Sequence, residues 1–182
     1  MQRMKRVVTY GMHLLAGVAT LGGCTPALNW RQVSADDSGL TVLLPCKPEH
    51  ATRSVMMRVD ASDVETNLSL HGCEASGMQF TLGDMVVPPD LTATQAMQAW
   101  RLASLATLRV SHTDAVPKSW DMMASHAQTE FMRANVVTDK NQVQWAWFAY
   151  GNKIYQAAVY GDAKEKGLSD AAETYFSGIK LP

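Results

Sequence analysis

The chain has 182 residues, of which 47% are hydrophobic and 18% are charged, with 16 Lys and Arg residues against 17 Asp and Glu residues. This composition excludes an intrinsically disordered protein, which is poor in apolar residues and carries a high net charge. The length indicates one domain, and the balanced charge lacks the clustered basic excess of a nucleic-acid-binding protein. We therefore expect one folded domain with no nucleic acid partner.

The N-terminal 23 residues have the features of a bacterial export signal. Arg3, Lys5 and Arg6 precede an apolar run at 7–21, and no acidic residue occurs among them. The run has about 15 residues, whereas a helix that spans the bilayer needs about 20. We therefore expect residues 1–23 to be a cleaved signal peptide and not a transmembrane anchor.

The end of this segment, Leu21-Gly22-Gly23-Cys24, resembles the lipobox of bacterial lipoproteins, in which an aliphatic residue and two small residues precede a cysteine. The resemblance implies that Cys24 carries diacylglycerol and palmitate-type acyl chains, which anchor the protein in a membrane. In such lipoproteins an Asp after the cysteine favours the inner membrane, and here that position is Thr25. The resemblance therefore implies an outer-membrane protein that faces the periplasm. An ordinary secretory signal followed by a chance cysteine is the alternative.

Cys46 and Cys73 are the two cysteines left in the mature chain. An even number in an oxidising periplasm indicates a disulfide. Closing a loop of 27 positions stabilises a fold by about 3 to 4 kcal/mol in the chain-entropy model. A metal pair or a redox dithiol is the alternative, but the sequence lacks the C-x-x-C spacing and the four tightly spaced ligands that these need.

Without residues 1–23 the chain has a formal charge of −4, because three basic and no acidic residues are removed.

The mature chain is expected to begin with a lipidated tether at 24–38, which is polar and rich in turn-forming residues, before a single domain at 39–182. Pro45 and Pro48 exclude helix early in that domain. Turns are expected at 60–63 and 72–77. Apolar and polar residues alternate between these breaks, which predicts an antiparallel meander with strands at 40–44, 55–59, 65–71 and 78–82.

The pattern becomes helical at 92–109, where Thr92 and Gln95 have the spacing of a capping box. A second helix is expected at 169–177, with Ser169 as its N-cap. Between the helices the sequence predicts a polar loop at 111–119, a strand at 128–137, a turn at 138–141 and a hairpin at 143–160.

The hairpin at 143–160 turns at Gly151-Asn152, a pair that suits a two-residue turn. This register predicts one face made of Val143, Trp145, Trp147, Ala149, Ile154, Ala158 and Tyr160. It predicts the opposite face from Ala146, Phe148, Tyr150, Tyr155, Ala157 and Val159. Both faces are apolar, so the hairpin is expected at the centre of its sheet. The predicted class is α+β, an antiparallel meander sheet with a central aromatic hairpin covered by the two helices.

The mature part resembles PsbP-like α/β sandwich domains of uncharacterised bacterial lipoproteins, in the segments GLTVLLPCKP, QWAWFAYGNKIYQAAVYG and SDAAETYFSGIKLP. Cys46 departs from that pattern, in which a Gly is common. The resemblance implies the sandwich fold and a non-enzymatic role, and it carries no functional residue. The matching positions are Leu44, Pro45, Pro48, Tyr155, Gln156, Phe176, Ile179 and Leu181.

No catalytic motif is present in the sequence: G-x-S-x-G, G-x-x-x-x-G-K-[ST], G-x-G-x-x-G and H-E-x-x-H are all missing. We expect the separated residues His50, His71, His112 and His126 to be surface or half-buried. The segment 122–126 holds Met122, Met123 and His126, whose soft ligands suit Cu(I), but methionine also fills cores. The aromatic residues Trp120, Trp145, Trp147, Tyr150 and Tyr155 could stack on a glycan, and a core role is favoured.

These observations predict a non-catalytic protein of the cell envelope, without cofactor or metal, that is held to the membrane through Cys24. The favoured function is the binding or scaffolding of an envelope protein, with the loops at 111–119 and 161–167 as recognition surfaces. The alternative is a lipoprotein that binds a small ligand or a metal. A hydrolase is the third possibility.

Overall fold

The structure of the chain is a computed structural model, which describes residues 28–35, 39–110 and 131–182 and the backbone of 116–118. The fold is α+β and mostly antiparallel sheet, as predicted. The strands are β1 (Arg31–Ser34), β2 (Thr41–Leu44), β3 (Glu49–Val59), β4 (Ser62–Ala75), β5 (Met78–Val86), β6 (Val116–Lys118), β7 (Phe131–Val137), β8 (Asn141–Tyr150) and β9 (Lys153–Asp162). The helices are α1 (Ala93–Thr107) and α2 (Leu168–Ser177).

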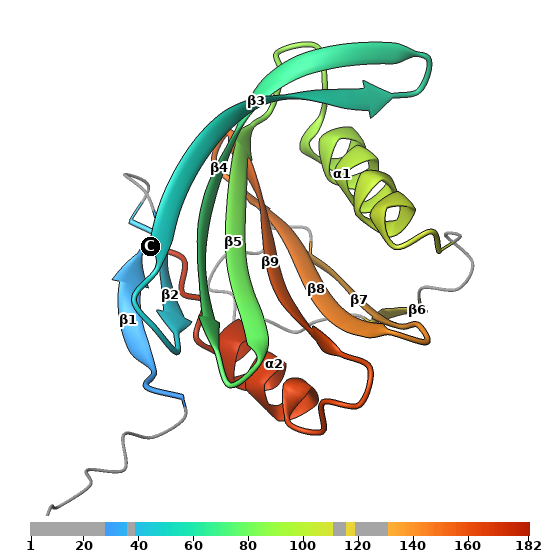
Figure 1. The fold of residues 1–182 in the computed structure, drawn as a ribbon. Helices are drawn as coiled ribbons and strands as arrows, with labels where there is room; N and C mark the ends of the chain where they lie inside the picture. The colour runs from blue at the N-terminus through green and yellow to red at the C-terminus, as the bar shows by residue number, and fades with distance from the viewer. Residues whose placement is uncertain (1–27, 36–38, 111–115, 119–130) are drawn as a thin grey trace, which may run out of the picture.

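Seven strands form one curved sheet in the order β3-β4-β5-β9-β8-β7-β6, and β1 and β2 form a separate two-stranded sheet. Two meanders, β3 to β5 and β6 to β9, meet where β5 pairs antiparallel with β9. Helix α1 packs in the concave side of the large sheet against β3, β8 and β9 (Figure 1). Helix α2 and β2 cover the opposite face. The large sheet is therefore enclosed on both faces.

The central hairpin β8–β9 has the register that the sequence predicts. Trp145 pairs with Ala158 and Phe148 pairs with Tyr155. Gly151 begins the turn with φ 62°, a conformation that favours glycine. One face of the hairpin packs with Met97 and Trp100 of α1, and the other packs with α2. Both faces are buried because the hairpin lies inside the sheet with a helix on each side.

The tip of the β3–β4 hairpin extends beyond the large sheet. Pairing between β4 and β5 begins at Leu68 and Met85, so residues 55–66, which we call the β3–β4 arm, form a two-stranded ribbon. In Figure 1 this arm arches over α1. Met57 and Val59 belong to the same apolar cluster as α1 and are buried. Packing on the helix therefore holds the arm in place.

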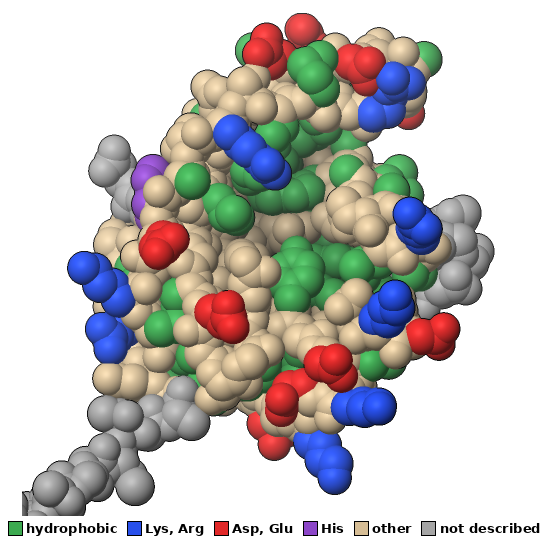
Figure 2. Space-filling model, viewed as in Figure 1, with side chains coloured by type: hydrophobic (Ala, Val, Ile, Leu, Met, Phe, Trp, Pro, Cys, Tyr) green, Lys and Arg blue, Asp and Glu red, His purple; other side chains and the backbone are tan. Residues whose placement is uncertain are grey.

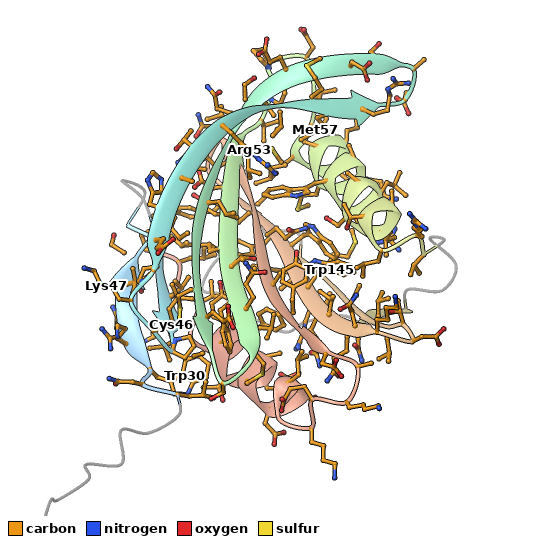
Figure 3. The ribbon with its side chains drawn as sticks, in the orientation of Figure 1. Trp30, Cys46, Lys47, Arg53, Met57 and Trp145 are labelled. Atoms are coloured by element: carbon orange, nitrogen blue, oxygen red, sulfur yellow. A yellow bond between two sulfur atoms is a disulfide. The ribbon has the colours of Figure 1, made fainter. Side chains whose placement is uncertain are left out.

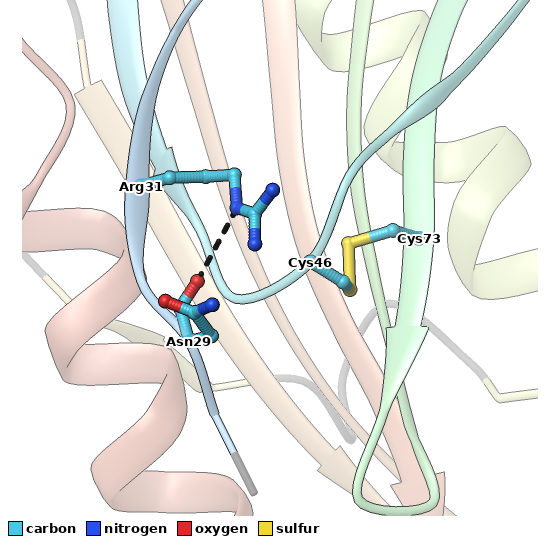
Figure 4. The surroundings of a disulfide bond; sticks show 4 residues. All are labelled: Asn29, Arg31, Cys46 and Cys73. Carbon is cyan, nitrogen blue, oxygen red and sulfur yellow. Dashed lines mark hydrogen bonds between the residues drawn. A yellow bond between two sulfur atoms is a disulfide. The ribbon is translucent and has the colours of Figure 1, made fainter. Parts of the chain in front are cut away.

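Cys46 and Cys73 form the predicted disulfide, with an S–S distance of 2.06 Å. Cys46 follows β2 and Cys73 lies in β4, so the bond joins the small sheet to the large one (Figure 4). Cys73 also packs against the apolar cluster beneath α2. The bond thus ties the N-terminal part of the chain to the centre of the fold.

The prediction of a tether at 24–38 is wrong for residues 28–35. β1 pairs with β2 in this segment, and the ring of Trp30 packs edge-on against Phe80 with centroids 5.7 Å apart. Leu28 and Val33 pack against the same core. The mostly polar composition of this segment does not indicate that it packs on the domain. Three apolar side chains are enough to hold so short a segment against the core.

Three local predictions also need correction. Gly72 lies within β4 and makes no turn, because its backbone continues the pairing with Glu49 and Thr81. Ser169 is not the N-cap of α2, which begins at the fully buried Leu168 after Gly167. The predicted loop at 111–119 contains β6, while 111–115 and 119 lie outside the described residues. In contrast, the capping box of α1 is confirmed.

Candidate ligand-binding groove

An apolar groove of about 380 Å³ lies on the concave side of the large sheet. Strands β3, β4, β5 and β9 supply its sheet side, and α1 supplies the opposite wall. Figure 2 shows a hollow in this region, with hydrophobic side chains along its walls. Ligand sites in proteins commonly have volumes of about 300 to 1,000 Å³ and mostly apolar walls. The groove therefore has the size and character of a small-molecule site.

The strand register explains why these side chains meet. Arg53 lies opposite Leu68, and Leu68 lies opposite Met85, so these three residues share one face of the sheet. Val55 and Met57 follow Arg53 on the same face because side chains alternate along a strand. Figure 3 shows Arg53 and Met57 on the same side of the sheet as α1, with Met57 close to the upper end of the helix. Because the sheet is curved, the side chains of Arg53, Val55 and Met57 face α1.

Helix α1 presents Trp100, Ala103, Ser104 and Thr107 to the groove. Their spacing of three or four residues places them along one side of the helix. Trp100 lies against the sheet at Gly83, the strand position where no side chain intervenes. Ala103 and Thr107 are exposed, so this part of the wall is open to solvent.

The buried polar atoms of the groove are paired within the protein. Gln156 on β9 donates from Nε2 to Ser104 Oγ at 2.7 Å, and the Ser104 hydroxyl donates to the Trp100 carbonyl at 2.9 Å. Both side chains are buried. An apolar ligand therefore enters without having to satisfy these groups, whose loss of hydrogen bonds would otherwise oppose binding.

Tyr160 brings a neutral hydroxyl to the end of the groove. Burial raises the pKa of Tyr160, and a hydrogen bond from Trp145 partly offsets this effect. Trp145 Nε1 donates to the Tyr160 hydroxyl at 3.2 Å. The hydroxyl is thus held as a polar but uncharged group at neutral pH.

Arg53 is the one charged residue among the described residues that line the groove. Its side chain is exposed, and among the described residues it has no hydrogen bond or ion pair. Arg58, further along the same strand, is instead bidentate to Asp63. Arg53 is therefore available to a negatively charged group, whereas Arg58 already has one.

The predicted histidines divide into two groups. His50 and His71 lie opposite each other on β3 and β4, with ring centroids 4.6 Å apart, and a hydrogen bond of 3.0 Å joins His50 Nε2 to Ser69 Oγ. His50 is exposed and His71 is half-buried, as expected. His112 and His126 lie outside the described residues, together with Trp120, Met122 and Met123. Within the described ranges, no group of three or more His, Cys, Asp or Glu side chains is placed to hold a metal ion.

The core interpretation of the hairpin aromatics is confirmed. Trp145, Trp147 and Tyr155 are completely buried, and the ring of Tyr155 stacks on Phe148 with centroids 4.9 Å apart. These rings are covered by protein, so they offer no platform to a glycan. Tyr150 is half-buried at the end of β8.

The predicted recognition loop at 161–167 is joined to the neighbouring turn. Ala163 N donates to the Lys140 carbonyl at 2.9 Å, and Gly167 N donates to Glu165 Oε1 at 3.0 Å. Gln142 also donates to the carbonyls of Asp162 and Glu165. These contacts give the loop a structural role, so its replacement by a flexible linker would cost stability.

No protein-family model matches the chain, and none of the curated proteins compared with it is similar in sequence. In the part of the chain that the structure describes, neither helix has the length and apolar character needed to cross a membrane. The groove itself was missed by sequence reasoning. The available signals were the alternation of Val55, Met57 and Val59 and the position of Trp100 on α1, but neither indicates that the two face each other.

Proposed function

We propose that the protein is a lipid-anchored, non-catalytic binding protein of the bacterial cell envelope, and that the apolar groove is its ligand site. The lipobox-like Leu21-Gly22-Gly23-Cys24 supports attachment to the membrane through Cys24, with residues 1–23 removed. Thr25 supports an outer-membrane location facing the periplasm. The disulfide agrees with an oxidising compartment. The PsbP-like sandwich and the absence of a cofactor are part of the same proposal.

The observation that carries this proposal is the combination of apolar walls with internally paired polar atoms. A hydrolytic site needs polar groups directed at a reacting bond, whereas Gln156 and Ser104 are engaged with α1 itself. The groove thus favours retention of an apolar molecule. This makes a small ligand, the second choice from sequence, the better-supported form of binding.

Fluorescence of 1-N-phenylnaphthylamine, an uncharged apolar probe, tests the groove directly. The full-length processed protein is placed in phosphatidylcholine nanodiscs, and the signal of empty nanodiscs is subtracted. Ala103→Phe adds a ring at an exposed position of the groove wall, and Ala106→Phe adds the same ring at an exposed α1 position that does not line it. We expect Ala103→Phe to abolish the saturable signal and Ala106→Phe to retain it. Equal signals from both variants would refute the groove as the site.

Binding of an envelope protein is the second candidate, and strand β3 favours it. β3 is the outermost strand at one edge of the large sheet and has 11 residues, of which most are exposed. An extended segment of a partner can add to such an edge through backbone hydrogen bonds. A photo-crosslinker at Thr52, compared with one at Thr138 outside this edge, would capture a defined partner peptide only at Thr52.

A further inference from the structure

A second cavity of about 550 Å³ adjoins the groove. Leu70, Gln79 and Thr81 line both spaces, so the two lie next to each other along the sheet. The remaining walls of the second cavity are largely polar and include Glu49 and Glu74. An apolar space therefore adjoins a polar one. A molecule that matches both has an apolar chain and a polar end.

Arg53 lies at the junction of the two cavities. Residues 49–51 of β3 line the second cavity, and Arg53, Val55 and Met57 line the groove. The Arg53 guanidinium thus stands where the polar end of such a molecule would lie. Because no described residue neutralises it, its charge is complementary to an anion.

We infer that the groove binds a single-chain amphiphile whose negatively charged group, a carboxylate or a phosphate, pairs with Arg53. This inference rests on the proposed function, because it names the class of ligand for the same site. The chain lies against Leu68, Met85 and Trp100, which form the apolar walls. A volume of about 380 Å³ holds on the order of ten chain atoms, if each takes about the 30 Å³ of a water molecule in the liquid.

The carboxylates of the second cavity limit where the anion can lie. Glu49 and Glu74 are negative, with Lys47 as the basic residue nearby in the lining. An anion that moved past Arg53 would approach these two carboxylates. The negative group is therefore held at the junction, and the chain is directed into the groove.

Photo-labelling with three diazirine-bearing probes of equal chain length tests the inference: a fatty acid, its alcohol and its trimethylammonium analogue. The full-length processed protein is labelled in phosphatidylcholine nanodiscs, and the modified peptides are mapped by mass spectrometry. We expect the acid to label peptides from 53–57 and 100–107 about tenfold more strongly than the alcohol, as one charge-assisted hydrogen-bonded pair implies, and the ammonium probe least. A lysophospholipid probe separates the two sources, since labelling by it alone assigns a phosphate and labelling by the acid assigns a carboxylate.

Variants of the arginine assign the effect to its charge. Arg53→Gln is expected to reduce acid labelling to the level of the alcohol, and Arg53→Lys is expected to retain most of it. Arg58→Gln, on the same strand but ion-paired to Asp63, is the matched control and should leave labelling unchanged. If neither the acid nor the lysophospholipid labels the unmodified protein more strongly than the alcohol, or if Arg53→Gln is labelled fully by the preferred anionic probe, the inference is overturned but apolar binding stays intact. If 1-N-phenylnaphthylamine also fails to bind, the proposed function falls with it.

Discussion

A Cβ atom at Gly83 would lie 3.0 Å from Cζ2 of Trp100. It would also lie 3.2 Å from Leu68 Cδ1. The indole of Trp100 is 9% exposed and belongs to the cluster that joins α1 to the sheet. The missing side chain on β5 thus sets how closely α1 approaches the sheet, and with it the width of the groove.

Gly83→Ala should therefore displace Trp100 and reduce the binding of 1-N-phenylnaphthylamine to the groove. Overpacking of a tight contact costs about 1 to 3 kcal/mol, which we expect to see as a lower free energy of unfolding in urea. Trp100→Phe provides a smaller ring, so the double variant should recover part of the stability lost in Gly83→Ala. A double variant whose losses simply add would show that the two residues are not coupled.

The Cys46–Cys73 bond predicts a protein with no free thiol at either position. Replacing both residues by Ala should lower the free energy of unfolding by about 3 to 4 kcal/mol, since the unfolded chain regains the freedom of a 27-residue separation. Urea denaturation of the oxidised protein, the reduced protein and the double variant measures this. The reduced protein should match the variant. Alkylation of both thiols in protein isolated without reductant would contradict the bond.

Tyr175 predicts a loss of stability at alkaline pH. It is completely buried and donates its hydroxyl to the Thr81 carbonyl at 2.8 Å. Burial, with a smaller contribution from Tyr160, raises the pKa of Tyr175 far above the ordinary tyrosine value of 10.0. Above pH 10 the tyrosine of the unfolded chain loses its proton while the buried tyrosine of the folded chain keeps it, so the free energy of unfolding falls as pH rises. Above pH 10, Tyr175 alone lowers the free energy of unfolding by about 1.4 kcal/mol per pH unit.

Tyr175→Phe separates this effect from the packing of the ring. The variant should lose about 1 kcal/mol at pH 7 because the hydrogen bond to Thr81 is removed. Its stability should then fall less steeply than that of the unmodified protein between pH 10 and 11. The remaining slope belongs to other groups, including Tyr160, whose pKa is also raised by burial. Parallel curves for the two proteins would exclude Tyr175 as a source of the pH dependence.

The proposed anchor predicts that Cys24→Ser blocks acylation and leaves an unprocessed or mislocalised precursor. Metabolic labelling with an alkyne-bearing palmitate and partition into a detergent phase provide two measurements. Cys46→Ser is the matched control, because it removes a cysteine outside the lipobox. Thr25→Asp should move the protein to the inner membrane on a density gradient. Normal acylation of Cys24→Ser would contradict the lipoprotein proposal.

The elements that were predicted well depend on local sequence. The β8–β9 hairpin follows from a two-residue turn and two apolar strands, and the start of α1 follows from the Thr92–Gln95 capping box. The predicted start of α2 was wrong because the helix already includes Leu168, whose side chain is fully buried. The preference of serine for the N-cap position at Ser169 does not outweigh that burial. Strand β1 was missed because the packing of Trp30 on Phe80 joins residues 50 positions apart.

The groove could not be predicted because it depends on long-range geometry. Arg53 and Met57 lie 47 and 43 positions before Trp100 in the sequence, and only the curvature of the sheet brings them to one space. In sequence, Arg53 is a charged residue on an exposed strand. Its significance follows from the neighbouring cavity and from the absence of an ion pair between Arg53 and any residue that the structure describes. The disulfide between Cys46 and Cys73, in contrast, could be predicted because two cysteines in an oxidising compartment are expected to pair with each other.

No described strand other than β3 and β4 pairs within the β3–β4 arm, which gives the two sides of the groove different local stabilities. Amides of residues 55–66 are protected by one neighbouring strand and by packing on α1, whereas those of β8 and β9 lie between strands on both sides. Hydrogen exchange in the arm should therefore proceed through local opening, at a free energy well below that of global unfolding. Such opening would widen the groove while the sheet beneath stays intact. A bound ligand that contacts both sides should slow exchange selectively in the arm.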